Sequence, residues 1–357
     1  SMSRPATALR YPPLGLLLGL LLAAALGACS EEGARRELRG STMGTTWSVI
    51  YAEPGRGVAP EGLQAGIELE LAAINATFST YIPDSEISRI NAAVSGDPLA
   101  VSDSFAQVLD TALAISRATG GAYDVTVGPL IELWGFGSGP GSEGVPPEAA
   151  IAAALKRVGW QQLDWDSQAR QLARPPGVAI DLSSIAKGYA VDRLAELLLN
   201  AGIRDFLVEI GGELRAAGER PGGGAWRLAI EAPRPTSSRV IEAVAVGNAA
   251  VATSGDYRNY FEVDGTRYSH LVDPRTGYPV EHDLVSVTVV HPHCVTADAW
   301  ATALLVMGRE AALGVSRAQG LAVYLVARDG EELAVEYTPQ FADYLVAERS
   351  QGVTGQR

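Results

Sequence analysis

Apolar residues recur along the chain with two kinds of spacing, which distinguish helical from extended segments. Spacings of three and four residues predict amphipathic helices, whereas alternation and runs of β-branched residues predict strands. The expected helices cover residues 63–78, 105–115, 147–158, 190–201 and 297–307. The expected strands cover residues 46–52, 206–210, 226–230, 240–246, 259–263, 284–290, 321–326 and 333–337.

This mixture of elements predicts an α+β, or mixed α/β, fold in which helices pack on largely antiparallel sheets. Gly120 and Gly121 follow the second helix, where glycine commonly ends a helix. The glycine-rich stretch 135–144 is expected to form a loop or an insertion that divides the domain into two lobes.

The composition indicates a folded chain and excludes one class of partner. Of the 357 residues, 47% are hydrophobic and 19% are charged, a balance that supplies a core and argues against disorder. The formal net charge is -13, so the chain lacks the excess of Lys and Arg with which proteins neutralise phosphate backbones. We therefore expect no nucleic-acid partner.

Residues 1–28 have the pattern of a bacterial signal peptide. Arg4 and Arg10 precede an uncharged run of Leu, Ala and Gly over residues 14–28, which is short for a membrane-spanning helix. The small residues before Cys29 resemble a lipoprotein cleavage box, so Cys29 is expected to become a lipidated N-terminus. The alternative is an ordinary secretory peptide that happens to contain this cysteine.

The next segment, residues 29–40, is polar and is expected to tether the domain to the lipid. With Cys29 used for the lipid, Cys294 has no cysteine partner in the chain. A disulfide within the chain is then impossible, and a single thiol argues against a zinc site. We expect Cys294 to be a buried structural residue rather than a reactive thiol.

Asp298 and Thr302 lie four residues apart in an apolar helical run, a spacing that places both on one face of a helix. A carboxylate and a hydroxyl side by side suit a hard cation such as Mg2+. Both residues also have ordinary explanations. Asp298, in the first turn, would complement the positive helix end, and Thr302 would bond back to a carbonyl one turn earlier.

Residues 181–192 have the pattern of a strand end that turns into a helix. Ser183 or Ser184 would cap this helix. Gly188 in its first turn is unfavourable for a helix, which indicates that another group approaches the backbone closely. Lys187 could reach a phosphate as a point charge. The alternative is a plain capped helix without a ligand.

His270 lies in the turn-forming stretch 269–277 and is one of four histidines. It is a candidate for proton transfer near neutral pH, although a histidine at a strand end is often a core residue. Tyr81 and Tyr123 follow helix ends, where each could pack in the core or stack on a planar ring. The sequence contains neither the glycine fingerprint of dinucleotide-binding folds nor a P-loop.

Together these motifs resemble those of the ApbE-type FAD:protein FMN transferases, formerly called thiamine biosynthesis lipoproteins. The matching pieces occur in the order of that family and follow a lipoprotein-like leader. They are residues 41–45, 80–81, 85–88, 121–126, 181–192, 209–212, 253–256, 269–277 and 298–302.

The resemblance implies a T-fold-like domain over residues 41–345, with an active site in a cleft between lobes and a flexible tail at 346–357. It implies an enzyme that transfers FMN from FAD to a Thr or Ser hydroxyl of a target flavoprotein, with release of AMP and a requirement for Mg2+. It also implies a lipid-anchored protein of the bacterial cell envelope, on the periplasmic face of the inner or outer membrane. Its acceptor would be a flavoprotein subunit of a membrane redox complex.

The resemblance assigns residues to this site by position. Asp298, Thr302 and the backbone carbonyl of Ala186 correspond to metal ligands. His270 is the candidate for the base or for phosphate stabilisation, and Asp298 is the competing base. The residues that correspond to FAD contacts are Met43, Tyr81, Ala122, Tyr123, Asp124, Ser184, Lys187, His270 and Leu271.

Two other functions stay open at this point. One is a metal-dependent FAD pyrophosphatase of the same fold, in which water replaces the protein hydroxyl. The other is a flavin-binding lipoprotein that stores FAD without turnover. The segment Ala186-Lys187-Gly188 replaces the Gly-Glu-Gly of some relatives, which leaves the role of the side chain at position 187 open.

Overall fold

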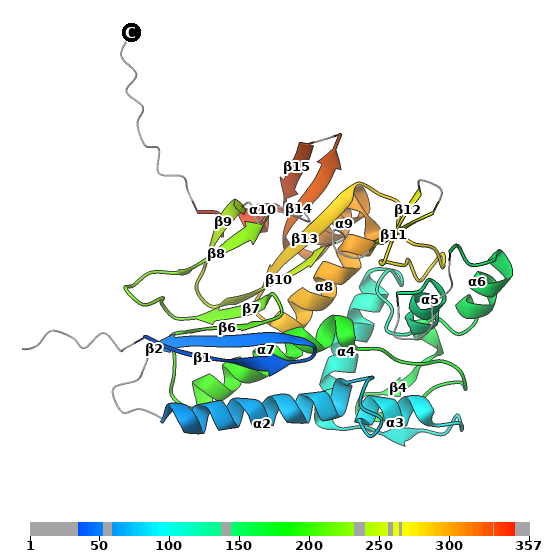
Figure 1. Cartoon of the computed structure of the whole chain (residues 1–357), viewed down its shortest axis with the longest axis horizontal. Coiled ribbons are helices and arrows are strands. Elements are labelled where there is room, and N and C mark those ends of the chain that lie inside the picture. The colour runs from blue at the N-terminus through cyan, green and yellow to red at the C-terminus, as the bar shows by residue number, and fades with distance from the viewer. Residues whose placement is uncertain are drawn as a thin grey trace, which may run out of the picture.

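The computed structural model describes residues 35–52, 59–136, 144–231, 240–255, 260–263, 266–330 and 332–346. Its largest element is an eight-stranded antiparallel sheet with the strand order β1-β2-β6-β7-β10-β13-β14-β15 (Figure 1). These strands are β1 (Arg35–Thr42), β2 (Thr45–Ala52), β6 (Phe206–Ile210), β7 (Glu213–Ala217), β10 (Ala249–Gly255), β13 (Leu284–His291), β14 (Ala322–Asp329) and β15 (Glu332–Tyr337).

Three small sheets accompany it in the described part of the chain. Two of them are hairpins, and the third joins three short strands. They consist of β8 (Trp226–Glu231) with β9 (Val240–Val246), β11 (Tyr260–Val263) with β12 (Thr266–Ser269), and β3 (Leu99–Ala100), β5 (Gln171–Ala173) and β4 (Asp164–Asp166).

Helices cover one face of the large sheet. Helix α7 lies against β6 and β7, α8 lies against β10 and β13, and α2 lies on the outer side of α7 (Figure 1). The helices are α2 (Pro60–Phe78), α3 (Glu86–Ala92), α4 (Asp103–Ala118), α5 (Gly128–Leu133), α6 (Glu148–Leu155), η1 (Trp160–Gln162), α7 (Ser183–Asn200), α8 (Cys294–Met307), α9 (Arg309–Gln319) and α10 (Pro339–Ala342). None of the helices in the described part of the chain is long and apolar enough to cross a membrane.

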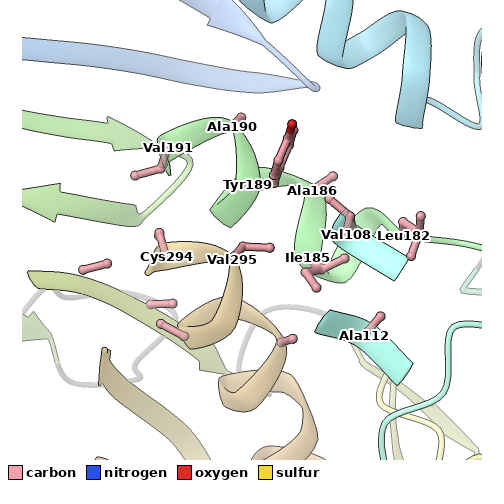
Figure 2. Close-up of a cluster of buried hydrophobic side chains, with 14 of the residues drawn as sticks. Val108, Ala112, Leu182, Ile185, Ala186, Tyr189, Ala190, Val191, Cys294 and Val295 are labelled. Carbon is pink, nitrogen blue, oxygen red and sulfur yellow. The ribbon is translucent and has the colours of Figure 1, made fainter. Parts of the chain in front are cut away.

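Strand β13 is buried on both faces, because the sheet separates two hydrophobic cores. Val287 and Val289 belong to the larger core beneath the helices, where side chains of α4, α7 and α8 meet (Figure 2). Val285 and Val290 belong to a smaller core that includes residues of the β8–β9 hairpin and α10. Full burial of a valine contributes about 1.5–3 kcal/mol, which explains why this strand is apolar at consecutive positions.

A third apolar cluster attaches α5 and α6 to the turn at residues 273–277. Trp134 donates its indole N–H to the carbonyl of Gly277 at 2.9 Å. Gly277 has φ +81°, and a Cβ there would lie 2.8 Å from Ile151, so the turn fits against α6 only as glycine. The expected glycine-rich loop begins at the end of α5, but its residues 137–143 lie outside the described residues.

The expected α+β class is confirmed, and the structure corrects one boundary. Residues 35–40, which we expected in the tether, form the first part of β1 and pair along their length with β2. Strand β1 is polar and mostly exposed, since it lies at the sheet edge, and its sequence therefore lacks hydrophobic alternation. The expected signal peptide and most of the expected C-terminal tail lie outside the described residues.

Helix α8 begins at Cys294 without a capping side chain of its own, and Asp192 of α7 provides the missing acceptor. The Asp192 carboxylate accepts the N–H of Cys294 at 3.0 Å and the N–H of Val295 at 2.9 Å. It also pairs with Arg215 of β7 at 2.7 Å. Because the first amides of a helix have no partner within the helix, this one buried carboxylate joins α7, α8 and the sheet.

We predict that Asp192→Ala lowers the free energy of unfolding by about 3 kcal/mol, since it leaves two buried amides and a partly buried Arg215 without their acceptor. Urea denaturation measures this loss. The matched control is Glu196→Ala, which removes an exposed ion pair with Arg193 on the same helix and should cost less than about 1 kcal/mol. Equal losses in the two variants would contradict the proposed capping role of Asp192.

Candidate active site

A cavity of about 840 Å3 opens where α7 and α8 meet the loops that follow α4 and β12. A second cavity of about 560 Å3 lies between the N-terminal end of α7 and the β1–β2 turn. The two cavities share Ser183 and Lys187. The expected site residues in the first wall are Ala122, Tyr123, Asp124, Ser184, Lys187, His270, Leu271, Asp298 and Thr302. Those in the second wall are Met43, Tyr81, Ala186 and Lys187.

The structure therefore gathers every expected site residue that it describes into two adjoining cavities. Cys29, the expected lipidation site, lies outside the described residues.

Gly188 allows α7 and α8 to approach each other closely. A Cβ at this position would lie 2.5 Å from the carbonyl oxygen of Cys294 and 2.7 Å from the Cβ of Asp298. The amide of Gly188 donates to Oδ2 of Asp298 at 2.9 Å. The expected close approach at Gly188 is confirmed, and the approaching group is the backbone of α8.

Asp298 lies in the second turn of α8 rather than in the first, because the helix begins at Cys294. Its expected alternative role as a partner of the helix end is therefore wrong, and Asp192 fills that role instead. Burial raises the pKa of Asp298 well above its usual range, and Glu213 raises this pKa further. The charge of Lys187 and the Gly188 amide act in the opposite direction.

Lys187 forms an ion pair with Glu213, the first residue of β7, at an Nζ–Oε2 distance of 2.7 Å. Burial alone would lower the pKa of Lys187, but the attraction of Glu213 and Asp298 outweighs burial and raises it. Two carboxylates thus act on one ammonium in this wall. Burial raises the pKa of both, and a bound cation would favour their charged forms. Residues 209–212 were among the matching motifs of the sequence, but no role was predicted for Glu213, which follows them.

Thr302 lies one turn after Asp298 and faces the same cavity. Its hydroxyl lies 3.3 Å from that of Ser254 on β10. In the described part of the chain no three His, Cys, Asp or Glu side chains gather as a metal site. A cation here would rely on hydroxyl, carbonyl and substrate oxygens beside Asp298, and such oxygen donors fit Mg2+. Ala186 lines the second cavity, and the role of its carbonyl as a ligand stays a prediction.

Ser184 does not cap α7 as expected. Its hydroxyl lies 2.9 Å from the hydroxyl of Tyr123. The Ser183 amide instead donates to Asp181 at 2.8 Å. Tyr123 is buried among core residues, and burial raises the pKa of its hydroxyl. The Tyr123 side chain therefore belongs to the core, and only its hydroxyl end reaches the cavity wall.

The Asp124 carboxylate already accepts hydrogen bonds from groups of the protein. It accepts the amide and hydroxyl of Thr126 at 2.8 and 2.6 Å and the amide of Trp160 at 2.9 Å. Burial raises its pKa, and these hydrogen bonds oppose the rise. The side chain thus shapes the wall of the first cavity by holding two loops together.

Two aromatic or imidazole side chains complete the walls. His270 is partly buried in the first cavity, with its ring centroid 6.3 Å from that of Phe136. Tyr81, which lines the second cavity, is 81% exposed. An aromatic ring in this position can stack on a planar ligand without rearrangement of the core.

A model of the ApbE family matches residues 43–325. The FAD:protein FMN transferase of Haemophilus influenzae is 43% identical over 318 residues, which cover 87% of this chain and 92% of that protein. The corresponding protein of Escherichia coli is 41% identical over 88% of this chain and 90% of its own length. The solved structure of the flavin transferase ApbE from Vibrio cholerae has a TM-score of 0.81 and 39% identity, and covers 87% of this chain and 99% of that one. The chain therefore belongs to the ApbE family, as its motifs predicted.

We predict that Gly188→Ala destabilises the protein by about 1–3 kcal/mol, because the added methyl group would overlap the backbone of α8. Helix propensity alone predicts the opposite sign, a gain of up to about 1 kcal/mol. Gly314→Ala in α9 is the matched control, since a Cβ there meets no atom within 4 Å. Chemical denaturation of both variants measures the difference, and a stabilised Gly188→Ala protein would refute the close contact.

Proposed function

We propose that this protein is an enzyme that transfers FMN from FAD to an acceptor protein, with AMP as the leaving group. The main support for this proposal is the pair of adjoining cavities. FAD consists of two ring systems joined by a diphosphate, and the two cavities meet at Lys187, whose ammonium can attract phosphate oxygens. Relatives about 40% identical over most of the chain are named for this activity.

We further propose that Mg2+ assists the reaction. Asp298, Thr302 and the carbonyl of Ala186 would hold the ion. Once bound, the ion would neutralise charge on the diphosphate and stabilise the departing AMP.

The chemistry requires a new bond between an acceptor oxygen and the FMN phosphorus, while the bond from that phosphorus to the AMP oxygen breaks. The acceptor, which we propose is a Thr or Ser hydroxyl, loses its proton in this step. Catalysis of phosphoryl transfer depends mainly on positioning and charge neutralisation. Lys187 would orient the diphosphate, and the partly buried contact between the Tyr123 and Ser184 hydroxyls helps to fix the shape of the wall.

His270 is the preferred group for the acceptor proton or for the transferred phosphate. It lies in a turn at the cavity wall, beside Leu271, where an incoming acceptor can approach it. Asp298 is the competing base, but one of its oxygens is already bound to the Gly188 amide. We prefer a ligand role for Asp298, because a cation on its other oxygen would leave neither oxygen free to accept the acceptor proton.

We also propose that the protein acts at the cell envelope. The apolar run at residues 14–28 and the small residues before Cys29 support a lipid anchor on the periplasmic face of the inner or outer membrane. The acceptor would then be a flavoprotein subunit of a membrane redox complex.

Mass spectrometry of a candidate acceptor, after incubation with the protein, FAD and Mg2+, tests the transferase activity. A mass gain equal to one FMN on a Thr or Ser, together with release of AMP, is expected. Chelation of the divalent cation should abolish the gain. Rapid formation of FMN and AMP without any acceptor would favour the pyrophosphatase alternative, and tight FAD binding without AMP would favour storage.

We predict that His270→Ala reduces single-turnover FMN transfer by about 100-fold or more, as expected for loss of a general base. FAD binding should change little, because the lysine and the oxygen donors remain. The matched control is His293→Ala, which removes an exposed histidine before α8 that lines neither cavity. Transfer by His270→Ala within a few-fold of the unmodified protein would exclude the proposed role.

A further inference from the structure

Lys187 is attracted by two carboxylates but bonds to one of them. Its Nζ donates to Glu213 at 2.7 Å, whereas within the described part of the chain it forms no ion pair with Asp298. Asp298 lines the same cavity as Lys187 and Glu213, and its charge contributes to the raised pKa of Lys187. The Lys187 ammonium can therefore bond either to Glu213 of β7 or to Asp298 of α8. In the structure it bonds to Glu213.

We propose that Glu213 is a positioning residue that holds the Lys187 ammonium away from Asp298 and so keeps Asp298 open to a divalent cation. This inference rests on the proposed function, because it concerns the cation ligand of the same site.

The backbone around Glu213 supports this orientation. Gly211 has φ +60°, and a Cβ there would lie 3.3 Å from Cδ of Lys187, so the lysine stem runs close against this glycine. The amide of Gly212 donates to Glu209 at 2.7 Å, which closes the turn before β7. Glu213 itself is only 3% exposed, so its carboxylate has little freedom to move. The Glu213 carboxylate is thus a fixed acceptor for the Lys187 ammonium, and the contact with Gly211 limits the path of the lysine side chain.

The Asp298 carboxylate has only one oxygen left for a cation. Its Oδ2 already accepts the Gly188 amide. The other oxygen can serve either a cation or an ammonium. In a buried site the attraction between Lys187 and Asp298 is only weakly screened by water. Without the charge of Glu213, Lys187 is drawn to Asp298 and competes with the cation for that oxygen.

The test is binding of Mn2+ alone, without FAD, measured by electron paramagnetic resonance of the free ion. Glu213→Gln keeps the shape of the side chain and removes its charge, and it should weaken Mn2+ binding by about tenfold or more, the scale seen when a group supporting a metal ligand is lost. Adding Lys187→Met to Glu213→Gln should restore binding, because the competing ammonium is gone. A merely structural role for Glu213 predicts no such rescue.

The variant Glu213→Asp distinguishes the effect of the carboxylate's position on Mn2+ binding from the effect of its charge. It keeps the carboxylate but shortens the side chain by one methylene, so it should hold Lys187 less well and weaken Mn2+ binding. If Glu213→Gln weakens binding and Glu213→Asp does not, net charge alone matters and the positioning role is overturned. The matched control is Glu70→Gln, which removes the carboxylate paired with Arg193 of α7 at 2.7 Å, away from both cavities. It should bind Mn2+ as the unmodified protein does.

The remaining outcomes separate this inference from the proposed function. Equal Mn2+ affinity in the unmodified protein and in Glu213→Gln, with Mg2+-dependent FMN transfer intact, would overturn the role of Glu213 and leave the transferase proposal standing. Failure of the unmodified protein to bind Mn2+ would overturn the role of Glu213 and remove the support for a cation at Asp298. The urea unfolding transition of each variant shows that the measured protein is folded.

Discussion

The contact between α7 and α8 at Gly188 is the constraint on which the site depends. Because position 188 has no side chain, the backbone of α8 lies against α7, and the Asp298 carboxylate reaches an α7 amide at 2.9 Å. Asp192 lies four residues after Gly188, hence on the same face of α7, and caps the start of α8. One face of α7 thus fixes both the position of α8 and the orientation of the α8 face that bears Asp298 and Thr302.

The same contact concentrates charge where it is unfavourable for stability. Asp298 and Glu213 are almost fully buried, and the Lys187 ammonium beside them bonds to Glu213. Buried charges stabilise a fold poorly even when they are paired, because desolvation offsets their attraction. An excess of carboxylates in a cavity wall is therefore better explained by a ligand than by the fold, which is the usual meaning of strongly perturbed acids in a cleft.

The sequence was informative where a local pattern decides the structure. Helices α2, α4, α6, α7 and α8 were recognised from their apolar positions, but α9 was missed although it has one apolar face. In the large sheet β1, β7 and β10 were missed, because β1 is an exposed edge strand, β7 directly follows a glycine turn, and β10 consists of small residues. The start of α8 was misplaced because its cap, Asp192, is 102 residues away. Ser184 was assigned to a cap for the same kind of reason, since its partner Tyr123 is 61 residues away. Glu213 has no local signal, and only the fold brings it to Lys187.

The two cavity walls differ in how they are built, and this difference bears on how a ligand would be held. In the first wall Asp124 and Tyr123 have hydrogen-bond partners before any ligand arrives, so this wall is preorganised. In the second wall Met43 has φ +49° in the β1–β2 turn, a left-handed conformation that costs a non-glycine residue about 1–2 kcal/mol. Tyr81 exposes most of its ring in the same wall. Neither the strained backbone nor the exposed ring stabilises the fold, and both are features that are common at ligand sites. Ligand binding should therefore bury the exposed ring in the second wall, whereas the first wall already has fixed groups that can position a ligand and stabilise charge on its phosphate oxygens.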